Sequence, residues 1–134
     1  MSTHSISEVA AMYQLTPATL RYYEELGLLY DVEKQHNHRI YRDCHLQRLS
    51  TICCFKNSGM SLKELQTLFQ YQSQDDNLDR VLTLLHTHQR KVDRQLSDLQ
   101  KAQAQIERKI AYYTALNNAK QAHLPLPDWQ DYKA

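Results

Sequence analysis

A row of residues at alternating steps of four and three runs through the second half of the chain. It is apolar except for two glutamines and one asparagine, and its members are Leu78, Leu82, Leu85, Gln89, Val92, Leu96, Leu99, Gln103, Ile106, Ile110, Tyr113 and Asn117. This heptad spacing predicts one coiled-coil helix over residues 77–118, roughly 60 Å long. A helix of that length cannot bury the whole row against the rest of a 134-residue chain, so it requires a partner helix.

The partner helix must come from a second copy, because the chain contains no second heptad helix. We therefore predict a homodimer in which seven apolar members of the row form the contact, namely Leu85, Val92, Leu96, Leu99, Ile106, Ile110 and Tyr113. The polar members fix the register of pairing. Residues 119–134 form a short tail, in which Pro125 and Pro127 block further helix. We expect Trp129 and Tyr132 to pack locally or against the partner.

The stretch 16–29 predicts a short amphipathic helix. Thr16 can cap its start, with Pro17 at the first helical position, and Gly27 can end it. Helical spacing places Leu20 and Tyr23 on the inner face, and Ala18, Arg21 and Tyr22 on the outer face. An arginine and an aromatic hydroxyl among small residues are typical of a helix that reads the DNA major groove. The alternative is an ordinary amphipathic surface helix.

The residues upstream favour the DNA-reading interpretation. Ser5 and Glu8 have the spacing of a capping box, which predicts a preceding short helix with apolar residues Ile6, Val9, Ala10 and Tyr13. Residues 14–16 then connect the two helices tightly. Two short helices joined by such a turn form a helix-turn-helix unit.

Residues 28–42 read as a β-hairpin wing. The two predicted strands are 28–30 and 39–41, with Asn37 as the best candidate for a left-handed position between them. We expect Asp43 to cap the next helix, whose core residues are Leu46, Leu49, Ile52 and Cys53, and which ends at residues 57–59. A second capping box at Ser61 opens a helix to about residue 71. Residues 72–77 form a polar break.

These strings resemble the MerR family of bacterial transcription regulators over about residues 4–117. The similarity is carried by TLRYYE at 19–24 followed by GLL at 27–29, by RIY at 39–41, and by FK at 55–56 with GMSL at 59–62. The resemblance implies a mostly α-helical fold with a small β-hairpin wing: a winged helix-turn-helix domain over 4–71, then a long helix that pairs antiparallel with its twin across a two-fold axis.

The resemblance also implies the function. Family members bind an inverted repeat in a promoter and distort the DNA so that RNA polymerase can engage, which makes the polymerase an indirect partner. The helical pattern and the resemblance together assign DNA contact to Thr16, Ala18, Thr19, Arg21, Tyr22, Tyr23, Arg39, Tyr41, Arg42 and Lys56. Arg39 and Lys56 correspond to backbone contacts, and Tyr41 to a residue that packs behind Arg39.

The net charge of +1 is low for a DNA-binding protein. Residues 1–63 hold seven Lys and Arg against six Asp and Glu, so no basic excess is concentrated there. The alternative function is therefore a coiled-coil interaction or anti-activator protein with a vestigial DNA-binding head. An enzyme is not expected, because neither paired carboxylates, a nucleophile–base pattern nor a phosphate loop stands out.

The cysteines bear on the signal that the protein senses. None follows Cys54, so a thiolate metal site of the kind found in metal-sensing relatives lacks its ligands, and no cofactor is expected. Cys53 falls on the predicted core face, and Cys44 lies in a first helical turn. The string ICCFKN at 52–57 resembles a family branch that responds to aldehydes, electrophiles or thiol oxidation. Cys54 matches the sensor position of that branch; the alternative is that Cys54 only packs.

The predicted location is the cytoplasm. No apolar run approaches the roughly 18 residues of a membrane span, and the N-terminus lacks the features of a secretory signal. Three cysteines without an even-numbered framework fit a reducing compartment.

Overall fold

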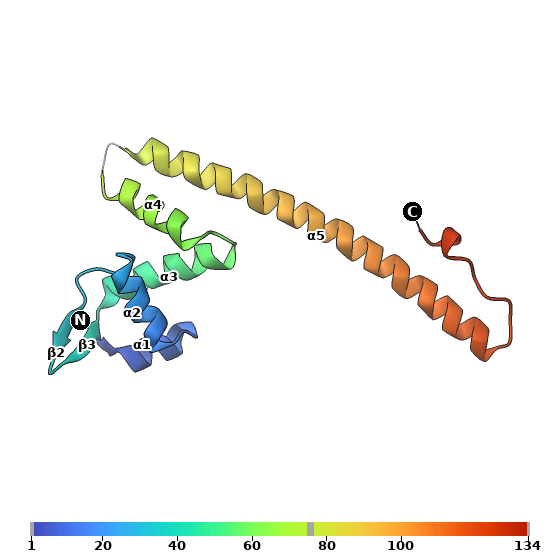
Figure 1. Cartoon of the computed structure of the whole chain (residues 1–134), viewed down its shortest axis with the longest axis horizontal. Helices are drawn as coiled ribbons and strands as arrows, with labels where there is room; N and C mark the ends of the chain where they lie inside the picture. Colours follow the sequence, from blue (N-terminus) through green and yellow to red (C-terminus); the bar gives the residue numbers. More distant parts are fainter. Residues whose placement is uncertain (1, 75–76, 134) are drawn as a thin grey trace. The chain divides into compact units, whose positions relative to one another are not determined.

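The computed structural model describes residues 2–74 and 77–133 (Figure 1). Its elements are β1 (His4–Ser5), α1 (Ile6–Tyr13), α2 (Pro17–Glu25), β2 (Glu33–Gln35), β3 (His38–Tyr41), α3 (Asp43–Asn57), α4 (Leu62–Gln72), α5 (Leu78–Gln121) and the 3-10 turn η2 (Trp129–Asp131). The mostly helical fold with a small sheet and a long helix near its end confirms the predicted fold class. The predicted break at 72–77 includes 75–76, which lie outside the described residues.

The chain divides into two compact units, which we describe separately. The first, called the head, is Met1–His88, and the second, called the distal unit, is Gln89–Ala134. The long helix α5 begins in the head and continues through the distal unit.

The helices of the head begin at side-chain caps that the sequence predicts. The Oγ atom of Ser5 accepts the backbone N–H of Glu8 at 3.2 Å, and the backbone N–H of Ser5 donates to the Glu8 carboxylate at 3.3 Å. Thr16 accepts the N–H of Thr19 at 3.1 Å, and Ser61 opens α4 with a second capping box. Each cap satisfies backbone donors that a helix leaves unpaired at its start.

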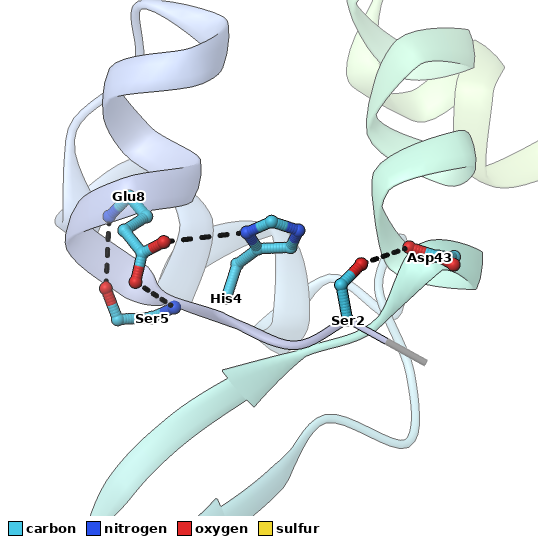
Figure 2. A network of polar contacts seen from close by, with 5 residues as sticks. All are labelled: Ser2, His4, Ser5, Glu8 and Asp43. Atoms are coloured by element: carbon cyan, nitrogen blue, oxygen red, sulfur yellow. Dashed lines mark hydrogen bonds and ion pairs between the residues drawn. The ribbon is translucent and has the colours of Figure 1, made fainter.

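Two contacts fix the N-terminal segment next to the cap of α1, one to α3 and one to α1 itself (Figure 2). The hydroxyl of Ser2 donates to Asp43 at the start of α3 at 3.4 Å, and His4 lies 3.6 Å from the carboxylate of Glu8. The hydrogen bonds from the backbone and hydroxyl of Ser5, followed by the one from His4, lower the pKa of Glu8. These contacts join the starts of α1 and α3.

Two glycines end helices as the sequence predicts. Gly27 has φ +77° after α2, and Gly59 has φ +94° after α3. The residue after each glycine donates its N–H back to the last helical turn, from Leu28 to the carbonyl of Tyr23 at 2.9 Å and from residue 60 at 3.0 Å. This is the Schellman arrangement, which favours glycine because the left-handed residue carries no Cβ penalty.

The hairpin differs from its prediction in the first strand. Residues 28–30 are not a strand: Leu28 is 0% exposed and Leu29 is 2% exposed, and both belong to the head core. The first strand is instead Glu33–Gln35, which pairs antiparallel with His38–Tyr41. An apolar run alone does not distinguish a buried loop from a buried strand, because both have the same composition.

A two-residue turn closes the hairpin. His36 and Asn37 have φ values of 52° and 65°, so both adopt the left-handed conformation of a type I′ turn. The left-handed position predicted for Asn37 is confirmed. The strand β1 pairs with the other side of β3, which gives the sheet the order β1-β3-β2.

The start of α3 also differs from its prediction. Asp43 is the first helical residue rather than the cap, and the N-cap position falls on Arg42. The backbone N–H of Arg42 donates to Nδ1 of His45 at 3.0 Å, and Nε2 of His45 contacts the carbonyl of Tyr30 at 2.9 Å. The nearly buried imidazole therefore caps α3 and ties it to the loop before the wing, because one ring nitrogen accepts while the other donates.

One apolar core joins all the helices of the head. Its buried residues come from α1 to α4, the connecting loops and β3, and are Val9, Ala10, Leu20, Tyr23, Leu28, Leu29, Tyr41, Leu49, Ile52, Met60, Leu65, Leu68 and Phe69. The first turns of α5 cover this core with Val81, Leu84 and Leu85, all half-buried. Leu85, predicted as a dimer contact, therefore packs within its own chain.

The distal unit leaves its apolar row uncovered. Five predicted contact residues are 54–68% exposed, namely Leu96, Leu99, Ile106, Ile110 and Tyr113, and Val92 is half-buried. The tail packs locally: the rings of Trp129 and Tyr132 lie 5.4 and 5.6 Å from that of Tyr112. Across the described residues, no helix is both long and apolar enough to cross a membrane.

Candidate nucleic-acid interface

The outer face of α2 is uncommitted, in the sense that its side chains are exposed and form no hydrogen bond or ion pair with the described residues. Ala18 and Arg21 are exposed, and the ring of Tyr22 is 48% exposed. Within the described chain, neither Arg21 nor Tyr22 has a side-chain hydrogen bond or ion pair, so both are available to a ligand. On the inner face, Leu20 is 0% exposed and Tyr23 is 6% exposed. Burial excludes a direct DNA contact by Tyr23, whose ring supports α2 from behind.

Thr16 and Thr19 serve the start of α2. Their Oγ1 atoms lie 2.9 Å apart, and Thr16 also caps the helix. Thr16 is exposed and Thr19 is half-buried. Both predicted contact residues therefore lie at the positive end of the helix dipole, which favours a phosphate.

A single carboxylate links α2 to the wing. Nε of Arg39 donates to Oε2 of Glu24 at 2.7 Å, and the hydroxyl of Tyr41 donates to the same oxygen at 3.4 Å. The side chains of Arg39 and Glu24 are 25% and 20% exposed, so this pair is better shielded from solvent than a surface ion pair. The wing is thereby held against the last turn of α2.

Tyr41 lies behind this pair. Its side chain is 0% exposed, so the prediction that it packs behind Arg39 agrees with its burial, and it cannot itself contact DNA. Burial, followed by the nearby Glu24 carboxylate, raises the pKa of Tyr41 to about 12. Tyr41 is therefore a neutral hydrogen-bond donor at physiological pH, which orients Glu24.

The other two predicted cations differ in their surroundings. Arg42 pairs with Glu33 of β2 at 2.8 Å, with side-chain exposures of 35% and 59%. Such solvated pairs contribute little to stability and open easily. Lys56 is exposed in the last turn of α3, three residues before Gly59. Both side chains remain available for phosphate contact.

Sequence reasoning missed Arg48, which links α3 to α4 and to the loop that follows α2. Its Nε donates to the carbonyl of Leu28 at 3.0 Å, and its guanidinium carbon lies 3.4 Å from the ring centroid of Phe69 in α4. Burial lowers the pKa of Arg48. Nearby, Gln66 donates to the carbonyl of Leu26 at 2.8 Å. Neither role has a local sequence signal, because each joins residues far apart in the chain.

The three cysteines are free thiols with different exposure. Cys44 and Cys54 are exposed, whereas Cys53 is half-buried. Burial raises the pKa of the Cys53 thiol, which makes it less reactive. Within residues 2–74 and 77–133, no group of three His, Cys, Asp or Glu side chains is placed to hold a metal ion.

The comparisons with known proteins agree with this arrangement. Residues 4–72 match the model of the MerR HTH family regulatory proteins, and residues 46–111 match that of the MerR DNA-binding region. The chain belongs to the MerR family. MerR proteins are transcriptional regulators, so this chain is a regulator of the MerR type, and its homologues are not enzymes.

Two relatives match nearly the whole MerR chain. An uncharacterized HTH-type transcriptional regulator of Haemophilus influenzae is 31% identical over 128 residues, which cover 92% of this chain and 95% of the relative. The crystal structure of HiNmlR, a MerR family regulator lacking the sensor domain and bound to promoter DNA, is 30% identical. It covers 92% of this chain and 97% of its own, with a TM-score of 0.77.

A third match is a MerR family regulator from Bacillus thuringiensis. Its crystal structure is 28% identical, with a TM-score of 0.69, and the match covers 82% of this chain and 98% of that chain. The similarity thus extends beyond the DNA-binding region into the long helix.

Proposed function

We propose that this MerR protein binds a palindromic promoter operator as a homodimer and controls transcription by distorting the DNA. The uncommitted outer face of α2 supports this proposal most directly: Arg21 and Tyr22 are exposed and unpaired on a helix whose inner face is fully packed. In this arrangement α2 enters the major groove, while Arg39, Arg42 and Lys56 contact the phosphate backbone.

The exposed row on α5 supports the dimer. Five large apolar side chains of the distal unit are more than half exposed along one helix face, which is unfavourable in water, and an antiparallel second copy would cover them. RNA polymerase is then an indirect partner, which engages the promoter after its distortion. A dimer also doubles the phosphate contacts, which compensates for a net charge of only +1.

Footprinting and fluorescence anisotropy on DNA from upstream of the protein's own gene test the proposal. We expect Arg21→Ala and Tyr22→Ala to abolish specific binding without changing helical content, because both side chains are exposed and neither belongs to the buried core. Arg39→Ala should weaken binding to all sequences and reduce the salt slope by about one unit. Lys101→Ala, on the exposed surface of α5, is the control.

Wild-type operator binding by Arg21→Ala would refute the α2 assignment. No binding to any promoter DNA by the wild type would instead favour the alternative, an interaction protein with a vestigial head.

We further propose that Cys54 senses electrophiles or oxidants. Its exposed thiol on α3 supports this role, whereas Cys53 is half-buried and its raised pKa disfavours reaction. Cys54→Ser should fold and bind the operator but lose the response of a promoter reporter to aldehyde and diamide. Cys53→Ser should lose stability and keep the response. An undiminished response in Cys54→Ser cells would remove this residue as the sensor.

A further inference from the structure

A cavity of about 820 Å³ lies in the head between the end of α2, α3 and α4. Leu26 and Gly27 border it from the end of α2, Tyr30 from the following loop, and Arg48 from α3, while the remaining wall belongs to α4. It is separate from the outer face of α2, since none of Ala18, Arg21 and Tyr22 borders it. Its size is within the range of small-molecule sites.

The charge of this cavity is one-sided. Arg48 and Lys63 border it, and among the described residues that line it there is no carboxylate. Neither cation forms an ion pair with any other described residue. Arg48 is half-buried, so its charge loses part of its hydration, and no carboxylate among the described residues forms an ion pair with it. Two cations without an ion-pair partner in the described part of the chain favour an anion in the cavity that both border.

The side chains around Arg48 favour a ligand that carries a planar ring. Its guanidinium is fixed by the carbonyl of Leu28 and by stacking on Phe69, so its two terminal amino groups are held in place without an acceptor among the described residues. The ring of Tyr30 lies 5.3 Å from the guanidinium carbon and is 60% exposed. The planar guanidinium can donate two parallel hydrogen bonds to an oxyanion, and the exposed ring beside it can stack on a flat apolar group. The site therefore suits an oxyanion attached to a planar ring.

We propose that this cavity binds a small organic anion, a carboxylate or phosphate carried on a planar ring, with Arg48 and Lys63 holding the oxyanion and Tyr30 contacting the ring. The site is independent of the DNA interface, and its occupancy is measurable on the free protein. Its failure is therefore distinguishable from a failure of operator binding.

Isothermal titration of the full chain with benzoate, phenyl phosphate and neutral benzamide tests the proposal. We expect at least one anion to bind about tenfold or more tightly than benzamide, which corresponds to about 1.4 kcal/mol. The stronger anion identifies the preferred oxyanion. Lys63→Gln should weaken anion binding several-fold, because it removes one of the two charges. The matched control Lys101→Gln removes the same charge from α5 and should change nothing.

Arg48→Lys keeps the positive charge but loses the planar pair of donors, so it tests the contribution of the guanidinium to anion binding. Circular dichroism checks that this variant folds. If that variant does not fold, Lys63→Gln decides alone, because the exposed Lys63 ammonium has no partner in the described chain. Three results would overturn the site: no anion binding at millimolar concentration, equal binding of benzamide, or unchanged affinity in Lys63→Gln. Loss of non-specific DNA affinity in Lys63→Gln without any small-anion binding would assign the cations to phosphate contact and also overturn it.

Discussion

Leu49 in α3 and Leu99 in α5 are both leucines on amphipathic helices, but Leu49 is 0% exposed and Leu99 is 68% exposed. Leu49 lies in the core that the head forms by itself. Leu99 lies on α5, where the described residues of the distal unit leave most of its side chain exposed. The difference shows which part of the chain is complete as a single copy. The head buries thirteen apolar residues in one core of its own, whereas five members of the row in the distal unit are more than half exposed, which supports the proposed dimer.

The largest expected effect comes from a charge on the exposed row. Leu99→Asp would bury a carboxylate in the proposed dimer interface at a cost of several kcal/mol, so it should abolish dimerisation and operator binding together while the head stays folded. Sedimentation and anisotropy measure both. The matched control Ser97→Asp places the same charge on α5 away from the row and should remain dimeric. A wild type that is monomeric at micromolar concentration would contradict the comparison itself.

The second prediction concerns the closed core. Leu49→Ala removes a fully buried side chain and should lower the free energy of unfolding by about 3 kcal/mol. Urea denaturation monitored by circular dichroism gives this value. Leu124→Ala deletes the same atoms from a side chain that is 62% exposed, and it should be nearly neutral. Equal losses in the two variants would mean that the tail leucine is covered in solution.

A third, smaller effect is the loss of stability at alkaline pH through the buried Tyr41. Because the pKa of Tyr41 is raised from 10.0 to about 12, its contribution to stability is complete below pH 10 and is lost as the pH rises to about 12. This loss amounts to about 2–3 kcal/mol. Tyr41→Phe should show a correspondingly smaller alkaline decline in urea unfolding. Identical profiles for Tyr41→Phe and wild type would refute the assignment.

The smallest effect is at a helix cap. Ser61→Ala removes the hydroxyl that caps α4 and should lower the free energy of unfolding by about 1 kcal/mol. Ser97→Ala, inside α5, removes the same hydroxyl where no backbone donor needs it and should have almost no effect. A neutral Ser61→Ala would show that water replaces this cap without cost.

Local features could be predicted from the sequence. The caps at Ser5, Thr16 and Ser61 and the endings at Gly27 and Gly59 depend on residues within one helical turn of each other, so a few letters determine them. The heptad row is local in the same sense, since it repeats one relation along one helix.

Non-local features could not be predicted. The shared carboxylate of Glu24, the imidazole of His45 and the guanidinium of Arg48 each join elements that are 15 or more residues apart. Tyr23 and Tyr41 were assigned to DNA contact with their neighbours, because sequence position does not show which aromatic rings the core needs. The candidate signal at Cys54 stays a prediction.

The uncommitted face of α2 has an evolutionary consequence. Ala18, Arg21 and Tyr22 are exposed, and their side chains form no hydrogen bond or ion pair with any described residue, so substitutions there leave the buried core and the Glu24–Arg39 link in place. On the proposed interface, a duplicated gene could therefore acquire a new operator by changing these three codons, with little loss of stability. The neighbouring Leu20 and Tyr23 do not have this freedom. The short helix thus combines positions that can diverge with positions that must stay fixed.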